Sequence, residues 1–274
     1  MSLYEKLTNA SDFFLIAGPC VIEEESIMLH TAEYLKNLSD RLKLPLVFKS
    51  SYSKANRSSG GSFSGPGLEK GLRLLSRIKR EFELPILSDV HEVCEVEAAA
   101  KVCDILQIPA FLCRQTSLIR AAAETGRIVN LKKGQFMAPE DMAAASAKVS
   151  ETGNEQILLT ERGSSFGYHN LIVDFRGFAI MALAGYPVVY DLTHSLQRPS
   201  SGTETGGNPE FAPMMARAAM ATGKVKGLFI ECHPEPEQAK SDAATMLSLS
   251  ELEGLLKPVI EICKQVRGLG AGGG

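Results

Sequence analysis

The sequence predicts an α/β protein that folds as a single (β/α)8 barrel, or TIM barrel, with its functional site at the C-terminal ends of the strands. Three observations predict this fold. The chain has 274 residues, a common length for one such barrel. Eight short apolar runs recur along it, and a helical pattern follows each. Runs such as "PLVF" and "GLFI" are apolar throughout, as is typical of parallel strands covered on both faces.

The expected elements follow one another regularly. The strands are predicted at residues 13–19, 45–50, 85–89, 105–109, 127–132, 157–161, 187–192 and 227–231. The clearest amphipathic helices are predicted at residues 23–42, 67–82 and 209–223, the last with proline at its start and glycine at its end. We therefore expect one barrel domain over residues 1–268 and a flexible C-terminal tail over 269–274.

Composition and charge argue against several classes of protein. Hydrophobic residues make up 45% of the chain and charged residues 22%, as in an ordinary globular protein. A net charge of −3 gives no support for binding to nucleic acid or to a membrane surface. The sequence contains neither a membrane-spanning apolar run nor the pattern of a signal peptide. Its six cysteines are widely spaced, so we expect reduced thiols and a cytoplasmic protein.

Polar or ionisable residues stand at the end of every expected strand. In a barrel these ends meet at one face, where catalytic groups gather. In chain order the residues are Cys20, Lys49, Asp89 with His91, Arg114, Lys132, Arg162, His194, and Glu231 with His233. A merely solvated face would not require lysine or arginine after the second, fourth, fifth and sixth strands. We therefore interpret this face as the functional one.

Four cations are expected to converge on the mouth of the barrel, namely Lys54, Arg114, Lys132 and Arg162. Unpaired buried charges are costly, so something anionic must offset them. Neighbouring carboxylates would do so if they formed salt bridges around the rim. The alternative is a small ligand with both phosphate and carboxylate groups, which arginine binds bidentately. The polar loop at 54–67, with Arg57 and Ser58, offers a second phosphate site.

The role of Cys20 depends on its partners. In a closed barrel the eighth strand lies beside the first, so Cys20 neighbours the ends of the last two strands. Those ends supply His194, Glu231, His233 and Asp242. A thiolate, an imidazole and carboxylates suit a divalent transition metal. The alternatives are a packing cysteine or a nucleophile, although no Cys-His-Asn arrangement accompanies it.

Several segments together resemble one known family. They are "AGPCVIE", "FKSSYSKANRSS", "GPGLEKGL", "DVHE", "IPAFLCRQT", "NLKKGQF", "TERGSSFGY", "DLTHSLQ" and "GLFIECHPEPEQAKSDA". On these segments, which extend over nearly the whole chain, the protein resembles the 3-deoxy-D-manno-octulosonate 8-phosphate (KDO8P) synthases. The related DAHP synthases share the barrel and the "GPC" element, but usually carry a K-P-R-T-S type loop where this chain has "KANRSS". That difference favours the KDO8P synthases.

The resemblance implies a transferase reaction. Phosphoenolpyruvate would condense with D-arabinose 5-phosphate and water to give KDO8P and inorganic phosphate, a step in lipopolysaccharide biosynthesis. Two alternatives remain open. One is a DAHP synthase that uses erythrose 4-phosphate, and the other is a non-catalytic barrel that binds a phosphosugar.

The resemblance also implies roles for individual residues. The phosphoenolpyruvate site would consist of Lys49, Lys54, Arg114, Lys132 and Arg162. The sugar phosphate would be held by Asn56, Arg57 and Ser58. The residues expected to be catalytic are Lys54, Asp89, His91, Lys132 and His194.

The cysteine at position 20 resembles the metal-dependent branch of the family, because the metal-independent branch has asparagine there. The implied ligands are Cys20, His194, Glu231 and Asp242, with His233 as a neighbour. They would hold one divalent ion per subunit, from among Fe, Zn, Mn, Co and Cd. Members of the family are homotetramers whose phosphosugar sites are completed at subunit interfaces, so we expect the same assembly here.

Overall fold

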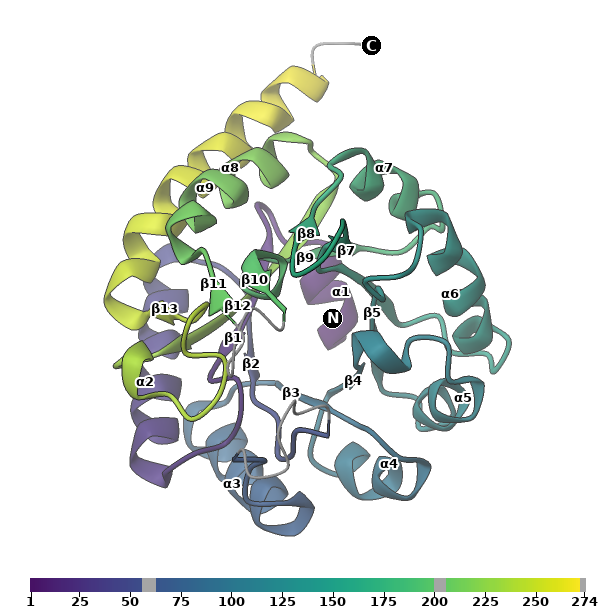
Figure 1. The fold of residues 1–274 in the computed structure, drawn as a ribbon, viewed down its shortest axis with the longest axis vertical. Coiled ribbons are helices and arrows are strands. Elements are labelled where there is room, and N and C mark those ends of the chain that lie inside the picture. The colour runs from purple at the N-terminus through teal and green to yellow at the C-terminus, as the bar shows by residue number, and fades with distance from the viewer. Residues whose placement is uncertain (56–62, 200–205, 272–274) are drawn as a thin grey trace.

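Eight parallel strands close into a barrel that helices surround (Figure 1). The computed structural model describes residues 1–55, 63–199 and 206–271. The strands pair in the order β1 (Phe14–Gly18), β2 (Leu46–Lys49), β3 (Ile86–Asp89), β4 (Ile105–Ile108), β5 (Ile128–Lys132), β6 (Ile157–Glu161), β9 (Val188–Asp191) and β12 (Val225–His233). Strand β12 also pairs with β1, which closes the ring. The predicted (β/α)8 barrel and its eight strands are confirmed.

The strands bury side chains on two faces, as their uniformly apolar sequences predict. In β1, Phe14 and Ile16 point into the barrel, where they pack with residues such as Val47 and Leu87. Leu15 belongs instead to the larger core between the strands and the helices. Gly227 pairs with Phe14, and a Cβ at Gly227 would lie 2.5 Å from the phenyl ring. The glycine therefore provides space for Phe14 inside the barrel.

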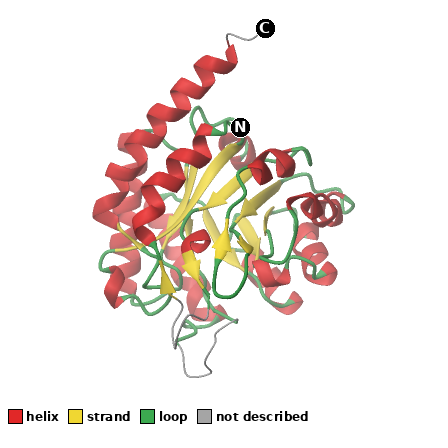
Figure 2. Cartoon of the chain, turned by 45° about the horizontal axis from the view of Figure 1, so that its top comes forward, coloured by secondary structure: helices red, strands yellow, loops and turns green. Residues whose placement is uncertain are grey.

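Helices cover the outside of the barrel (Figure 2). They are α2 (Glu25–Leu42), α3 (Leu68–Phe82), α4 (Val93–Ala100), α5 (Thr116–Glu124), α6 (Met142–Ser150), α7 (Arg176–Ala182), α8 (Ala212–Ala221) and α9 (Leu249–Ala271). Helix α2 buries Met28, Ala32 and Leu35, whose spacing places them on one face. The predicted helices are confirmed, although residues 209–211 form a 3-10 turn before α8.

A short N-terminal helix, α1 (Leu3–Thr8), lies in the middle of the ring in the view of Figure 1. Ser2 and Glu5 form a capping box at its start. Leu7 joins the core inside the barrel, and the hydroxyl of Tyr4 donates a hydrogen bond to the carbonyl oxygen of Ile157 at 3.1 Å. Because Ile157 begins its strand, α1 covers the N-terminal end of the barrel.

Several two-residue strands were not predicted. Strand β7 (Ser164–Ser165) pairs with β8 (Leu171–Ile172), β10 (Gln197–Arg198) pairs with β11 (Gly206–Gly207), and β13 (Leu247–Ser248) pairs in parallel with the end of β12. Such short strands carry no detectable period, so a sequence pattern does not reveal them. Helix α9 continues to Ala271, and residues 272–274 of the expected tail lie outside the described part. In that part, no helix is long and apolar enough to cross a membrane.

Candidate active site

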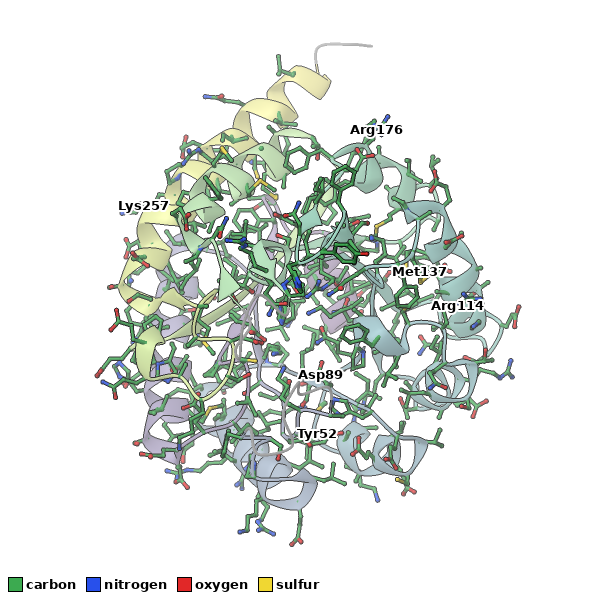
Figure 3. The ribbon with its side chains drawn as sticks, viewed as in Figure 1. Tyr52, Asp89, Arg114, Met137, Arg176 and Lys257 are labelled. Atoms are coloured by element: carbon green, nitrogen blue, oxygen red, sulfur yellow. The ribbon has the colours of Figure 1, made fainter. Side chains whose placement is uncertain are left out.

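A polar cavity opens at the C-terminal ends of the strands. All five residues that the sequence marked as catalytic line it, together with Lys49 and Arg162. Figure 3 shows Asp89 near the centre of the ring. Gln107, Gln135 and Phe111 complete the polar and aromatic part of the wall.

Each lysine of the cavity faces a carboxylate. The Nζ atom of Lys49 lies 2.5 Å from Oε1 of Glu231, and both side chains are only 1% exposed. Lys132 Nζ lies 2.5 Å from Oδ2 of Asp191. Burial lowers the pKa of Lys132, although the charge of Asp191 opposes that effect. Neighbouring carboxylates therefore offset part of the positive charge of the cavity. This was one of the two explanations that the sequence left open, the other being an anionic ligand.

Arg162 is the cation with spare hydrogen-bonding capacity. Its Nη2 atom donates to Oε1 of Gln197 at 2.8 Å. Its Nη1 atom is buried and has no hydrogen-bond partner among the described residues. Burial lowers the pKa of Arg162, against the charges of Asp191 and other carboxylates. A buried guanidinium nitrogen without a partner is costly, so an anionic ligand is the natural partner for Arg162.

Arg114 does not join the other cations in this structure. It is exposed and lies toward the outside of the ring in Figure 3. After β4 the chain forms a 3-10 turn over Ala110–Leu112, and buried Cys113 packs beside Met137. This turn carries Arg114 outward before α5 begins. Asn56, Arg57 and Ser58 lie outside the described residues.

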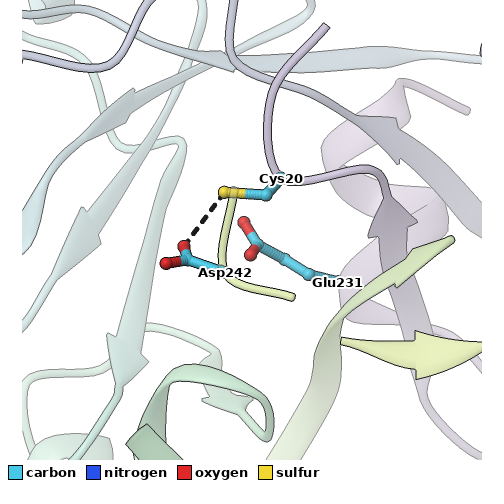
Figure 4. Close-up of side chains that lie close together, drawn as sticks. All are labelled: Cys20, Glu231 and Asp242. Atoms are coloured by element: carbon cyan, nitrogen blue, oxygen red, sulfur yellow. Dashed lines mark hydrogen bonds between the residues drawn. The ribbon is translucent and has the colours of Figure 1, made fainter. Parts of the chain in front are cut away.

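Cys20, Glu231 and Asp242 come together as a group that could hold a metal ion (Figure 4). One ligand atom from each lies within 4.8 Å of the others. The Cys20 thiol donates to Oδ2 of Asp242 at 3.0 Å. Gly18, two residues before the cysteine, pairs with Glu231, so the closure of the barrel brings the two together. Asp242 has a φ of 51°, a left-handed conformation that turns the loop after β12 toward Cys20.

His194 approaches the same group from the end of β9. Its Nε2 atom lies 3.6 Å from Oε1 of Glu231 and 3.8 Å from Oδ2 of Asp242. Its Nδ1 atom faces Asp191, with 2.8 Å to Oδ2. A carboxylate behind an imidazole fixes the ring and its tautomer, as is common for metal-binding histidines. His233 lies outside the group, because its Nε2 faces Glu23 Oε2 at 3.8 Å.

The electrostatics of the group fit a divalent cation. Burial raises the pKa of Cys20 well above its usual value, and the charges of Asp242 and Glu231 raise it further. Oε2 of Glu231 is buried and has no hydrogen-bond partner in the described part of the chain. A metal ion would offset the repulsion among one thiolate and two carboxylates, and would satisfy that oxygen. The donor set therefore fits a transition metal.

Asp89 and His91 differ in how many hydrogen bonds their side chains form. Asp89 accepts a hydrogen bond at 2.5 Å from the hydroxyl of Ser51 and another from the side-chain amide of Gln107. The Nδ1 atom of His91 is buried and lacks a hydrogen-bond partner among the described residues, with Glu95 Oε2 3.7 Å away. Asp89 is thus fixed as an acceptor, whereas His91 retains a ring nitrogen that makes no hydrogen bond to the described residues.

Sequence reasoning missed several buried polar residues around this cavity. Asp191 is 0% exposed and contacts both Lys132 and His194. Gln107 and Asn130 interrupt the apolar runs "ILQI" and "IVNLK", and Thr160 interrupts "ILLTE". A polar residue inside a fully apolar strand was the available signal, because such a residue must find a hydrogen-bond partner.

Comparisons with known proteins agree with this geometry. Residues 6–267 match the model of the DAHP synthetase I family. A 2-dehydro-3-deoxyphosphooctonate aldolase of Dichelobacter nodosus is 55% identical over 250 residues, which are 91% of this chain and 90% of the relative. The enzyme of the same name from Magnetococcus marinus is 53% identical over 262 residues, which are 94% and 91%. The chain therefore belongs to the DAHP synthetase I family, and within it to the 2-dehydro-3-deoxyphosphooctonate aldolases, or KDO8P synthases.

Proposed function

We propose that the protein condenses phosphoenolpyruvate with D-arabinose 5-phosphate and water to give KDO8P and inorganic phosphate, for lipopolysaccharide biosynthesis. The observation that carries the proposal is the partnerless Nη1 atom of Arg162 in a cavity that also holds Lys49, Lys54 and Lys132. Such a cavity suits a small ligand with two anionic groups. The relatives that match nearly the whole chain are named for a phosphorylated 3-deoxyoctonate, which supports this choice.

Phosphoenolpyruvate would lie between Arg162 and the lysines. Arg162 and Lys132 would hold its phosphate, and Lys54 with Lys49 would face its carboxylate. Lys54 is 3.6 Å from Asp89, which leaves it the most loosely paired of the three lysines. We leave Arg114 out of this clamp within one subunit, because its side chain is exposed.

The sugar phosphate would bind to Asn56, Arg57 and Ser58. The base of their loop is placed by described neighbours, since the backbone amide of Lys54 donates to the carbonyl of Ser64 at 2.9 Å. Ser64, which follows the three residues in the chain, is thus held beside Lys54, a residue that lines the cavity. A phosphosugar held there would present its aldehyde toward the site of phosphoenolpyruvate.

The proposed condensation forms two bonds and then expels phosphate. C3 of phosphoenolpyruvate bonds to the aldehyde carbon, whose oxygen takes up a proton, and water adds at C2 and loses a proton. The C–O bond between C2 and phosphate then breaks, phosphate leaves with its bonding electrons, and the new hydroxyl at C2 loses its proton to form the carbonyl of KDO8P. Lys132 and Arg162 would stabilise the departing phosphate. Asp89 would supply a fixed negative charge near C2, and His91 would move a proton.

A divalent metal would be held by Cys20, His194, Glu231 and Asp242. When bound, it would polarise the sugar aldehyde or orient the attacking water. Fe, Zn, Mn, Co and Cd are all compatible with this donor set, and thiolate ligation favours the softer ions. The compact arrangement of three of the four side chains supports this assignment.

We further propose a cytoplasmic homotetramer whose interfaces lie near the active sites. All six cysteines are free, which suits a reducing compartment. Phe111 lines the cavity and is 55% exposed, and Phe136 at 58% and Phe166 at 66% are exposed in the segments that follow β5 and β6. A monomer rarely exposes such a group, so a second subunit is a fitting cover. Light scattering on the purified protein measures the number of subunits.

Phosphate release tests the reaction. The purified protein is mixed with phosphoenolpyruvate and either arabinose 5-phosphate or erythrose 4-phosphate, before and after chelation, and with divalent metals added back. We expect phosphate with arabinose 5-phosphate, loss on chelation and recovery with metal. Preference for erythrose 4-phosphate would indicate a DAHP synthase, and no release with either sugar would indicate a binding protein. Activity that survives chelation would retain the reaction and exclude an essential metal.

A further inference from the structure

Four buried side chains form a continuous chain of hydrogen bonds across four neighbouring strands. The hydroxyl of Thr160 donates to Oδ1 of Asn130 at 2.6 Å. Nδ2 of Asn130 donates to Oε1 of Gln107 at 2.7 Å. Nε2 of Gln107 then donates to Oδ1 of Asp89. We call this set the polar relay.

The register of the sheet aligns three of the four relay residues. Asp89 pairs with Gln107, and Gln107 pairs with Asn130, so these three lie side by side on β3, β4 and β5. Thr160 reaches Asn130 from β6. Gln107 and Asp89 line the cavity, whereas Asn130 and Thr160 are 0% exposed. The relay thus begins inside the core and ends at the active site.

The relay has a direction. A side-chain amide has one accepting oxygen and one donating nitrogen, so the bond made at one end fixes the bond at the other. The hydroxyl of Thr160 occupies the oxygen of Asn130, which turns the nitrogen of Asn130 toward Gln107. The oxygen of Gln107 is occupied in turn, and its nitrogen faces Asp89. Every bond therefore donates toward the carboxylate.

Both oxygens of Asp89 are used as acceptors. Gln107 occupies Oδ1, the hydroxyl of Ser51 lies 2.5 Å from Oδ2, and Lys54 Nζ is 3.6 Å from the same atom. Burial would raise the pKa of Asp89, but the positive charges that face it, Lys54, Lys49, His91 and Lys132, together lower it. Asp89 is thus held in its ionised form.

We propose that Asn130 and Thr160 are positioning residues for the condensation, because they orient Gln107 so that Asp89 remains a fixed anion facing Lys54 and does not carry protons. The inference rests on the proposed function. It assigns a role to two side chains that do not line the cavity. Thr160 also pairs in register with Lys132, so the pH profile of kcat is needed to separate an effect that passes through Gln107 and Asp89 from one that passes through Lys132.

Two substitutions and two control variants test the direction of the relay in the metal-loaded enzyme. Thr160→Val keeps the shape and removes only the first donor, and Thr160→Ser keeps the hydroxyl. Asn130→Asp offers an oxygen where Gln107 needs a donor, which would turn the amide of Gln107 around and place its oxygen against Asp89. Thr31→Val is the matched control, since Thr31 is also 0% exposed but lies on α2, and its hydroxyl has no partner among the described residues.

We expect Thr160→Val to lower kcat by about 3- to 10-fold, with Thr160→Ser and Thr31→Val close to the wild type. We expect Asn130→Asp to lower kcat at pH 7 by about 10- to 100-fold. It should also add an acidic limb to the pH profile of kcat, because the introduced carboxylate and Asp89 would then share one proton along the relay. A loss caused by packing alone would not produce that limb. Thermal unfolding checks that each variant is folded.

The inference is overturned if Thr160→Val retains kcat within about twofold, or if Thr160→Ser loses as much as Thr160→Val. If Asn130→Asp does not fold, the kcat values of Thr160→Val, Thr160→Ser and Thr31→Val still test the inference. A wrong proposed function would be recognised separately. In that case the wild-type enzyme itself would release no phosphate from phosphoenolpyruvate and arabinose 5-phosphate.

Discussion

Lys49 and Glu231 form an ion pair of 2.5 Å that is almost completely removed from solvent. The ammonium group also donates to the backbone carbonyl of Cys20 at 2.9 Å. Burial would raise the pKa of Glu231, but His194, Lys49 and Lys54 lower it to about 2. One lysine thus compensates a carboxylate of the metal group and contacts the backbone of the thiol ligand.

Replacing Lys49 with methionine should destabilise the protein strongly. The substitution preserves most of the side-chain volume and leaves Glu231 buried without its principal partner. Breaking a buried pair in this way costs about 3–5 kcal/mol in the free energy of unfolding. Urea denaturation in the presence of a chelator measures the loss. Lys36→Met is the control, because Lys36 and Asp40 form an exposed pair, worth about 1 kcal/mol or less.

The double variant Lys49→Met with Glu231→Gln should recover part of that stability, because it removes the stranded charge. If Lys49→Met alone cost less than about 1 kcal/mol, the pair would not be compensating a buried charge.

The barrel closure made this neighbourhood predictable from sequence. Cys20 and Asp242 are separated by 222 positions, and the pairing of β12 with β1, together with the turn at Asp242, brings them to 3.0 Å. Apolar runs identify the strands, strand order follows the chain, and the ends of adjacent strands must meet. The positions of Lys49, Lys132 and Arg162 followed from the same reasoning.

The position of Arg114 could not be predicted in this way. Its distance from the end of β4 depends on a 3-10 turn at Ala110–Leu112, and the direction of a turn is not encoded in hydrophobic periodicity. The contacts of the relay residues Gln107 and Asn130 could not be predicted, for another reason. A buried polar residue in a strand signals that a partner exists, but the identity of that partner depends on the cross-strand register.

Arg162→Met should weaken catalysis while the fold is retained. The substitution removes the partnerless Nη1 atom that we assign to the phosphate of phosphoenolpyruvate. We expect kcat/KM for phosphoenolpyruvate to fall about 100-fold or more. Arg176→Met is the control, because Arg176 is 86% exposed and pairs with Asp174 on the surface. An unchanged kcat/KM would exclude Arg162 from the anion site.

Cys20→Ser should change the metal site in a way that spectroscopy detects. Co(II) bound through the Cys20 thiolate would give a sulfur-to-metal charge-transfer band, which serine, as an oxygen donor, does not supply. We expect the band in the Co(II)-loaded wild type and its loss in the variant. Cys94→Ser, at the exposed cysteine, is the control and should keep the band. A band that survived in Cys20→Ser would show that another thiol binds the metal.

Asp89→Asn should alter the pH dependence of stability. The folded-state pKa of Asp89 lies below the unfolded-state value, so its charge contributes stability above the unfolded pKa of about 3.9, and the contribution is lost as pH falls below it. The stability difference between wild type and variant should be constant from about pH 5 to 7. Below about pH 4 it should shrink by up to about 1.4 kcal/mol per pH unit.

Denaturation by urea at each pH measures that difference. Asp40→Asn is the matched control, because Asp40 is 61% exposed and its pair with Lys36 contributes little. Other buried carboxylates titrate equally in both proteins and cancel. A difference that stayed constant down to pH 3 would mean that Asp89 is not held ionised by the fold.

Gly18→Ala should separate the two strands that carry Cys20 and Lys49. Gly18 has a φ of 154°, and a Cβ atom there would lie 2.1 Å from the backbone oxygen of Lys49. A backbone atom cannot move aside as a flexible side chain does, so β1 and β2 must shift apart. We expect a loss of about 2–4 kcal/mol in the free energy of unfolding and weaker metal binding.

Gly254→Ala is the opposite case and provides the control. Gly254 is exposed within α9, and no atom in the described part lies within 4 Å of its added Cβ. Alanine is the better helix former, so this variant should gain about 0.5–1 kcal/mol. Urea denaturation and metal titration of both variants distinguish a local clash from a general intolerance of alanine. If Gly18→Ala kept its stability and its metal affinity, the close approach of Gly18 to Lys49 would not be what fixes the spacing of the site.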